Sequence, residues 1–169
     1  MAYAELHCLS NFTFLCGASH AEELVARAHE LGYAALAITD ECSLAGIVRA
    51  HVAAKECGLK LIVGSEIRFS DGPCVVLLAT NRAGYGNLSA LITRGRRSAT
   101  KGRYALSLDD LRDGLPGCLA LLLTDSPPTL EHAQTLAARF PGRPCVMVQP
   151  LRAPDDAERL AAASDLAQA

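Results

Sequence analysis

The sequence lacks the features that would place it in a membrane or outside the cell. Its longest apolar runs, such as GCLALLL at 117–123, are too short to cross a bilayer. The N-terminus has no basic start followed by a small-residue cleavage site, so no signal peptide is predicted. The 7 cysteines are scattered and form no CxxC pair, which argues against both a zinc knuckle and a disulfide framework. We therefore expect a cytoplasmic protein, with no membrane partner, that keeps its thiols reduced.

An excess of charge of one sign is also missing. The formal net charge is -2, so no general attraction to nucleic acid is expected, and such binding has to come from a local patch. Half of the 169 residues are hydrophobic and a fifth are charged. A chain of this length and composition can bury one sizeable core but is too short for two, which predicts a single domain over residues 1–169.

Strand and helix signals alternate along the chain. Apolar runs predict strands at 3–9, 34–40, 59–69, 74–80, 117–125 and 144–150. Helical spacing and end signals predict helices at 21–31, 44–56, 86–94, 129–140 and 154–169. Ser19 and Glu22 are expected to form the capping box of the first helix. The turn dipeptide Asp71-Gly72 predicts a hairpin between the third and fourth strands.

This alternation predicts an α/β fold with a largely parallel sheet. Complete βα barrels need about 250 residues. We therefore expect an incomplete, distorted βα barrel, similar to a TIM barrel, with one β-hairpin insertion and one antiparallel pair. The domain is expected to be truncated on its C-terminal side. An unfinished sheet exposes a strand edge, so self-association is also predicted.

Polar side chains stand near the ends of three predicted strands: His7, Asp40 and Glu66. Strands that run in one direction would bring these ends to the same rim, where βα proteins place their functional groups. An imidazole with carboxylates is an ordinary ligand set for zinc or manganese. The alternative is that these residues are polar only because the chain reaches the surface there.

A basic segment follows the third predicted helix. Five cations and no acid lie within ten residues, namely Arg94, Arg96, Arg97, Lys101 and Arg103. One interpretation is a loop that contacts nucleic-acid phosphates, with a contribution that falls as salt rises. The other is a solvated loop, or one that forms salt bridges to a neighbouring domain; the negative net charge favours this second interpretation.

Residues 4–67, from AELHCLSNFTFLCGASH to LIVGSEI, resemble the N-terminal PHP (polymerase and histidinol phosphatase) domain of bacterial C-family DNA polymerases. ITDECSLAGIVRAH and NLSALIT carry most of the resemblance, which favours the error-prone branch of these polymerase alpha subunits. The resemblance extends through LPGCLALLL and so covers nearly the whole chain.

The metal-binding pattern of that family is only partly kept. His7, Asp40 and Glu66 match its first histidine, its second-strand aspartate and its third-strand glutamate. Leu9 replaces the second histidine of the His-x-His pair, Cys16 the loop aspartate, and Glu41 the histidine of Asp-His. The resemblance therefore implies a degenerate site in which His7, Asp40, Glu41 and Glu66 hold at most one weakly bound zinc or manganese ion.

The resemblance also implies a function. We expect the N-terminal domain of an error-prone polymerase, used in DNA replication and damage-induced synthesis, with a structural and interaction role and no catalytic residue of its own. Its partners would be the rest of the polymerase chain and, through the parent enzyme, DNA. Two alternatives stay open: a metal-dependent phosphoesterase or 3′–5′ exonuclease, and a stand-alone module that binds single-stranded DNA through residues 94–103.

Overall fold

A computed structural model describes residues 2–124, 129–150 and 152–168. Its strands are β1 (Ala4–Glu5), β2 (Ala35–Ile38), β3 (Lys60–Arg68), β4 (Cys74–Ala79), β5 (Cys118–Leu123) and β6 (Pro144–Met147). Its helices are α1 (Ala21–Glu30), α2 (Ile47–Cys57), α3 (Arg82–Arg97), α4 (Leu130–Arg139) and α5 (Asp156–Gln168), with a short 3-10 turn at Leu108–Leu111. Asp125 and Ala169, which end two predicted elements, lie outside the described residues.

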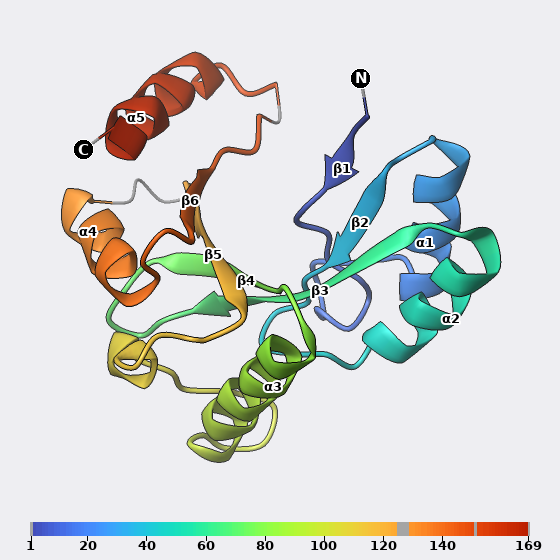
Figure 1. The fold of residues 1–169 in the computed structure, drawn as a ribbon, viewed down its shortest axis with the longest axis horizontal. Coiled ribbons are helices and arrows are strands. Elements are labelled where there is room, and N and C mark those ends of the chain that lie inside the picture. Colours follow the sequence, from blue (N-terminus) through green and yellow to red (C-terminus); the bar gives the residue numbers. More distant parts are fainter. Residues whose placement is uncertain (1, 125–128, 151, 169) are drawn as a thin grey trace.

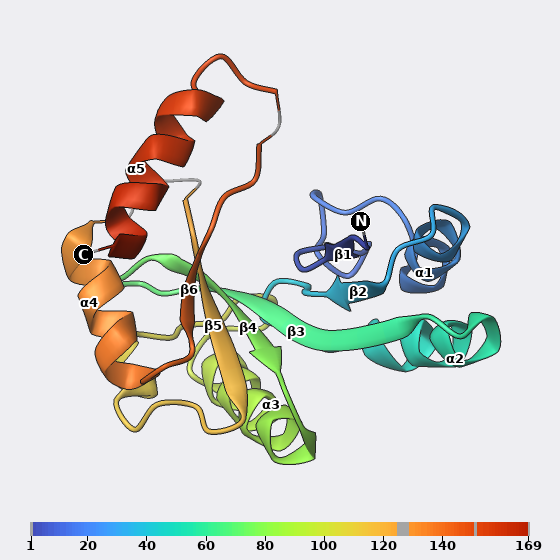
Figure 2. The same ribbon diagram turned by 45° about the horizontal axis from the view of Figure 1, so that its top comes forward.

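The strands form one sheet whose spatial order is the order of the sequence, β1-β2-β3-β4-β5-β6. Figures 1 and 2 show this sheet curled into half a barrel, with α1 and α2 beside β1–β3 and with α4 and α5 beside β5 and β6. The predicted α/β class and incomplete barrel are therefore confirmed. β1 and β6 are the edge strands, and self-association through them stays a prediction.

Strand β4 runs against the others. Pairs β1–β2, β2–β3 and β5–β6 are parallel, whereas β4 is antiparallel to both β3 and β5. The hairpin predicted at Asp71-Gly72 is confirmed, but the expectation of one antiparallel pair was wrong. β5 docks on the free edge of β4 and runs in the same direction as β3, so β4 is antiparallel to both of its neighbours.

Two apolar clusters hold the helices on the sheet. Val25 of α1 and Ile47 of α2 pack with Ile38 of β2, which is buried along its whole length. On the other half, Leu88 of α3 and Phe140, which follows α4, pack against the strands from β3 to β5. β2 and most of β4 and β5 are buried on both faces, as continuous apolar runs predict, whereas the edge strands β1 and β6 are only partly buried.

Several element ends differ from the prediction. Helix α1 begins after His20, because the Glu23 carboxylate accepts the backbone N–H of His20 at 2.8 Å, so the expected Ser19–Glu22 box was one residue early. Helix α3 is longer than 86–94: it begins after Asn81, whose side chain accepts from the Gly84 N–H, and it runs to Arg97. Within the described ranges, every helix is too short or too polar to span a membrane.

Candidate functional site

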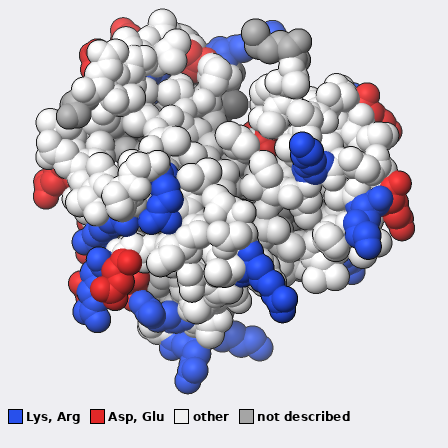
Figure 3. Space-filling model, viewed as in Figure 1, with Lys and Arg blue, Asp and Glu red and all other residues white. Residues whose placement is uncertain are grey.

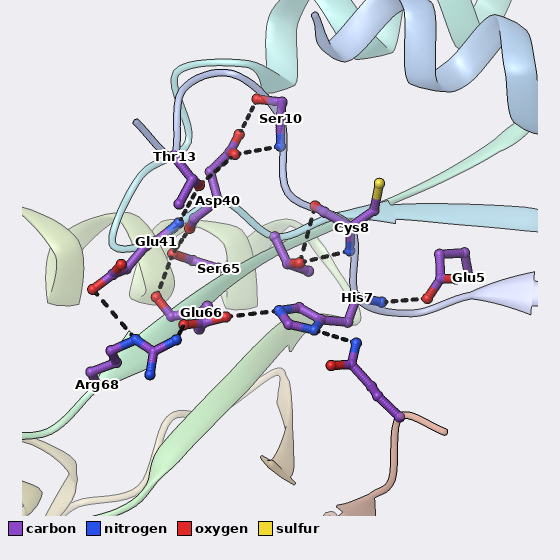
Figure 4. Close-up of polar contacts among 12 residues, drawn as sticks. Glu5, His7, Cys8, Ser10, Thr13, Asp40, Glu41, Ser65, Glu66 and Arg68 are labelled. Atoms are coloured by element: carbon purple, nitrogen blue, oxygen red, sulfur yellow. Dashed lines mark hydrogen bonds and ion pairs between the residues drawn. The ribbon is translucent and has the colours of Figure 1, made fainter. Parts of the chain in front are cut away.

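Three neighbouring strands place the predicted site residues along one rim. His7 follows β1, Asp40 and Glu41 follow β2, and Glu66 lies near the end of β3. Because these strands are parallel, their carboxyl ends lie at the same edge of the sheet. Glu41 and Glu66 pair in a parallel bridge that extends the β2–β3 ladder. Figure 4 shows the four side chains together with the groups that contact them.

The imidazole of His7 is held through both of its ring nitrogens. Gln149, in the segment after β6, lies with its side-chain nitrogen 2.7 Å from Nδ1. An amide nitrogen only donates, so Nδ1 accepts and the proton of the neutral ring sits on Nε2. That nitrogen donates to Glu66 Oε2 at 2.9 Å. The His7 side chain is 7% exposed, and neither nitrogen has a lone pair left for another ligand.

Glu66 is a buried carboxylate with a partner on each oxygen. Its side chain is 2% exposed, and Arg68 Nη2 lies 2.6 Å from Oε1 while His7 contacts Oε2. Burial alone raises the pKa of this carboxyl group. The hydrogen bond from His7 and the charge of Arg68 outweigh burial and hold the Glu66 pKa below its ordinary value. The folded protein therefore keeps Glu66 ionised.

Asp40 anchors the loop that follows β1. Its carboxylate accepts the backbone N–H of Ser10 at 2.7 Å, the Ser10 hydroxyl at 2.6 Å and the Thr13 hydroxyl at 2.8 Å. Asp40 itself is 1% exposed, and both of its oxygens are used. The loop then reaches solvent, where Phe14 is 82% exposed and Cys16 is also exposed. The role visible for Asp40 is therefore to fix a loop.

Glu41 is bound by two groups from other elements. The Tyr104 hydroxyl donates to Glu41 Oε1 at 2.7 Å, and Arg68 Nε lies 3.8 Å from the same oxygen. The backbone N–H of Arg68 in turn donates to the Tyr104 hydroxyl at 3.0 Å. Burial and the Glu41 carboxylate raise the pKa of Tyr104, so the phenol stays protonated and continues to donate.

These contacts decide whether the predicted ligands fit a metal ion. In the described part of the chain, no three His, Cys, Asp or Glu side chains are grouped so that they could hold one. The buried polar atoms without a partner belong to Asn11, Glu22, Arg139 and Asp156, and thus not to the four predicted ligands. As arranged, the four residues do not fit the metal. Weak binding of zinc or manganese stays a prediction.

The sequence reasoning missed the groups that occupy this rim. Arg68 carried a signal, because residues two apart in a strand share a face and Arg68 follows Glu66 at that spacing. Tyr104 and Gln149 carried none: they reach Glu41 and His7 from 63 and 142 residues away in the chain. Ser10 and Thr13 lie in the predicted motif, but nothing in the sequence pairs them with Asp40.

Two cations of the basic segment make contacts within the chain. Arg96 donates to the backbone oxygens of Cys42 and Glu41 at 3.1 and 3.2 Å, and its guanidinium lies 5.4 Å from the centre of the Tyr104 ring. Arg94 pairs with Asp110 at 3.3 Å. Arg94, Arg96 and Arg97 belong to the last turn of α3, so the expectation of a loop was wrong for Arg96 and Arg97, while Arg94 was already the last residue of the predicted helix.

All five cations of the segment are exposed, so Arg97, Lys101 and Arg103 differ from Arg94 and Arg96 in their contacts and not in their exposure. Figure 3 shows Lys and Arg side chains at the lower end of the molecule, where Figure 1 places α3 and the turn after it. Three of the five predicted nucleic-acid contacts are therefore available to a partner, and two are engaged in contacts within the chain.

Comparison with known proteins gives consistent matches. The family model described as "PHP domain" matches residues 5–139. The chain is 57% identical over 171 aligned residues to the error-prone DNA polymerase of Dechloromonas aromatica (strain RCB), covering 98% of this chain and 17% of that protein. It is 58% identical over 159 residues to the error-prone DNA polymerase of Pseudomonas aeruginosa, covering 94% of this chain and 15% of that protein. The chain thus spans about a sixth of the length of these curated relatives.

Solved structures share the fold at low sequence identity. A putative metal-dependent phosphoesterase from Bifidobacterium adolescentis has a TM-score of 0.69 at 16% identity, covering 98% of this chain and 84% of that one. An amidohydrolase from Chromobacterium violaceum has a TM-score of 0.68 at 17% identity, covering 97% and 83%. With the match over residues 5–139, the chain belongs to the PHP domain family, and it is homologous to the N-terminal region of error-prone DNA polymerases.

Proposed function

We propose that this chain serves an error-prone DNA polymerase as a structural and interaction domain, and that its rim is held by protein contacts in place of a metal centre. Two observations together carry the proposal. The chain is 57% identical, over 98% of its length, to an error-prone DNA polymerase, and the side chains of the rim are held by hydrogen bonds and ion pairs with other side chains of the protein. His7 contacts Glu66 and Gln149, Glu66 also contacts Arg68, and one oxygen of Glu41 accepts from Tyr104.

Such a domain stabilises its parent enzyme without taking part in its chemistry. Nucleotide transfer needs carboxylates that hold metal ions at the primer end, and the carboxylates of this rim already have protein partners. The rest of the polymerase chain is then the main partner, and contact with DNA comes through the parent enzyme. We place the phosphodiester-forming chemistry outside residues 1–169.

The test compares two variants in the full-length polymerase. Asp40→Ala removes the anchor of the β1 loop, whereas His7→Ala removes a candidate metal ligand. We expect Asp40→Ala to lower the melting temperature and yield of the polymerase, while the turnover per folded molecule in primer extension stays unchanged. The isolated chain should release no nucleotide from a labelled 3′ end with either Mn²⁺ or Zn²⁺. Release that depends on His7 would favour the phosphoesterase instead.

The exposed cations Arg97, Lys101 and Arg103 favour a second candidate, binding of single-stranded DNA. A phosphate contact weakens as salt rises, because it releases counterions. Charge reversal at Arg97 and Lys101, which have no role in the rim, should then lower affinity and flatten its salt dependence in fluorescence anisotropy with an oligonucleotide. If neither quantity changes, these cations are only a solvated surface.

A further inference from the structure

We propose, building on the structural role inferred above, that Arg68 is the resident cation of this rim and occupies the place where a divalent metal ion would otherwise neutralise Glu41 and Glu66. The guanidinium group pairs directly with Glu66 and at longer range with Glu41, so the rim is held without a metal and offers none a site.

The two glutamates create a need for positive charge. Glu41 and Glu66 are partners in a bridge between adjacent parallel strands, which places their side chains next to each other. Like charges in directly neighbouring strand positions repel each other. Glu66 is also almost completely buried, where an isolated carboxylate is costly. A cation between these two groups reduces both penalties.

Arg68 meets this need from within the same strand. It lies two residues beyond Glu66 in β3 and therefore on the same face. Its Nη2 is 2.6 Å from Glu66, its Nε is 3.8 Å from Glu41, and Figure 4 shows the guanidinium reaching toward both. Tyr104 fixes this arrangement, since its hydroxyl accepts from the Arg68 backbone and donates to Glu41.

The same geometry excludes a metal ion. A divalent ion that approached Glu66 would meet the positive charge of Arg68 on one side and the Nε2–H of His7 on the other. Gln149 occupies the remaining ring nitrogen of His7. Removal of Arg68 frees Glu66 Oε1 and leaves two adjacent carboxylates without a counter-charge, which is a ligand set that Mn²⁺ accepts.

The experiment follows thermal unfolding by circular dichroism in EDTA and in MnCl₂. Arg68→Met removes the charge and keeps an apolar stem. Arg27→Met is the matched control, because Arg27 also forms an ion pair on the surface, with Glu30, but lies on α1 outside the rim. The melting temperature of wild type should be the same in EDTA as in MnCl₂, and so should that of Arg27→Met. Arg68→Met should melt lower in EDTA and recover at least about 2 °C in MnCl₂.

Isothermal titration with MnCl₂ gives the second readout. Arg68→Met should bind Mn²⁺ at least about tenfold more tightly than wild type, and adding Glu66→Gln should abolish that gain. If Arg68→Met does not fold, Arg68→Gln, which keeps a donor for Glu66, replaces it. If both are unfolded in EDTA, recovery of the helical signal in MnCl₂ supports the proposal, and no recovery overturns it.

Three other results overturn it: a wild type whose melting temperature falls in EDTA, a wild type that binds Mn²⁺ as tightly as the variant, or a folded variant that binds none. Failure of the proposed function looks different. A fall in primer-extension turnover per folded molecule in Asp40→Ala, with a wild-type melting temperature unaffected by EDTA, would remove the structural role and leave the assignment of Arg68 intact.

Discussion

Replacing Asp40 by alanine tests whether this residue is a loop anchor or a metal ligand. Three donors point at its carboxylate: one backbone N–H and two hydroxyl groups. Hydrogen bonds to a charged group contribute about 1.5–3 kcal/mol each, but they are not additive, and the hydroxyls of Ser10 and Thr13 can turn to other acceptors. The Ser10 N–H cannot turn, because the backbone holds it in place.

We therefore expect Asp40→Ala to lose about 3 kcal/mol of unfolding free energy. For a domain of this size, 1 kcal/mol shifts the melting temperature by about 2–4 °C, so the midpoint should fall by about 6–12 °C. Urea titration followed by circular dichroism measures the free energy directly. Asp109→Ala is the control, since the Asp109 side chain is 75% exposed and its ion pair, with Arg112, lies on the surface.

If Asp40 is a loop anchor, Asp40→Ala should lose the same unfolding free energy in EDTA as in MnCl₂. A loss below about 0.5 kcal/mol would show that the three hydrogen bonds do not hold the loop. A loss that vanishes in EDTA would show that wild-type Asp40 acts through a bound ion, and would refute the reasoning from protein donors alone.

Three further predictions concern the same half of the molecule. Gly17→Ala should lower the unfolding free energy by about 2–4 kcal/mol in urea titration, because a Cβ there would lie 2.0 Å from the backbone oxygen of Ser10. Gly86→Ala is the control: Gly86 lies on α3 with open space around it, so this variant should raise the unfolding free energy by up to about 1 kcal/mol. Contacts with His7 and Arg68 depress the pKa of Glu66, so its contribution is complete above the ordinary value of 4.5 and is lost as pH falls through the lower folded pKa. The difference in melting temperature between wild type and Glu66→Gln should accordingly be constant at neutral pH and shrink below pH 4.5; a difference that grows on acidification would contradict the lowered pKa. Leu9→His should by itself leave Mn²⁺ uptake unchanged in isothermal titration, because Arg68 still holds both glutamates, and uptake in the single variant would mean that the missing imidazole was the main deficiency.

Much of the fold could be predicted because its signals are local. The apolar run of β2, the glycine that ends α2 and the turn between β3 and β4 each depend on a few adjacent residues. Gly58 ends α2 with a φ of 76°, a conformation that glycine adopts without strain. The largely parallel sheet also followed from alternation, since short βα units place consecutive strands side by side.

The extent of α3 could not be predicted for a reason that lies in tertiary packing. Gly84 weakens a helix in isolation, but a Cβ there would lie 1.9 Å from the Gly117 backbone oxygen, so close packing of two segments requires glycine. Gly95 similarly faces the Leu106 side chain. A residue that reads locally as a helix breaker is here a point of close contact, and only the folded structure reveals its partner.

The position of the candidate site could be predicted from the sequence, but the groups that contact its residues could not. His7, Asp40 and Glu66 were placed on one rim because strands joined through helices run in the same direction, and each strand and helix has a local signal. Their chemistry depends on which donors arrive there, and the decisive ones come from Arg68, Tyr104 and Gln149. Two of those three are contributed by segments whose approach depends on how far the sheet curls.

The order of the sheet bears on how the chain folds during synthesis. Among the described residues, each strand hydrogen-bonds to strands adjacent in sequence, so every new strand can dock once it has left the ribosome. Gln149, which contacts the His7 ring, follows β6 and therefore completes the arrangement last. A released chain truncated before residue 149 should assemble its strands but leave the His7 ring with one of its two contacts.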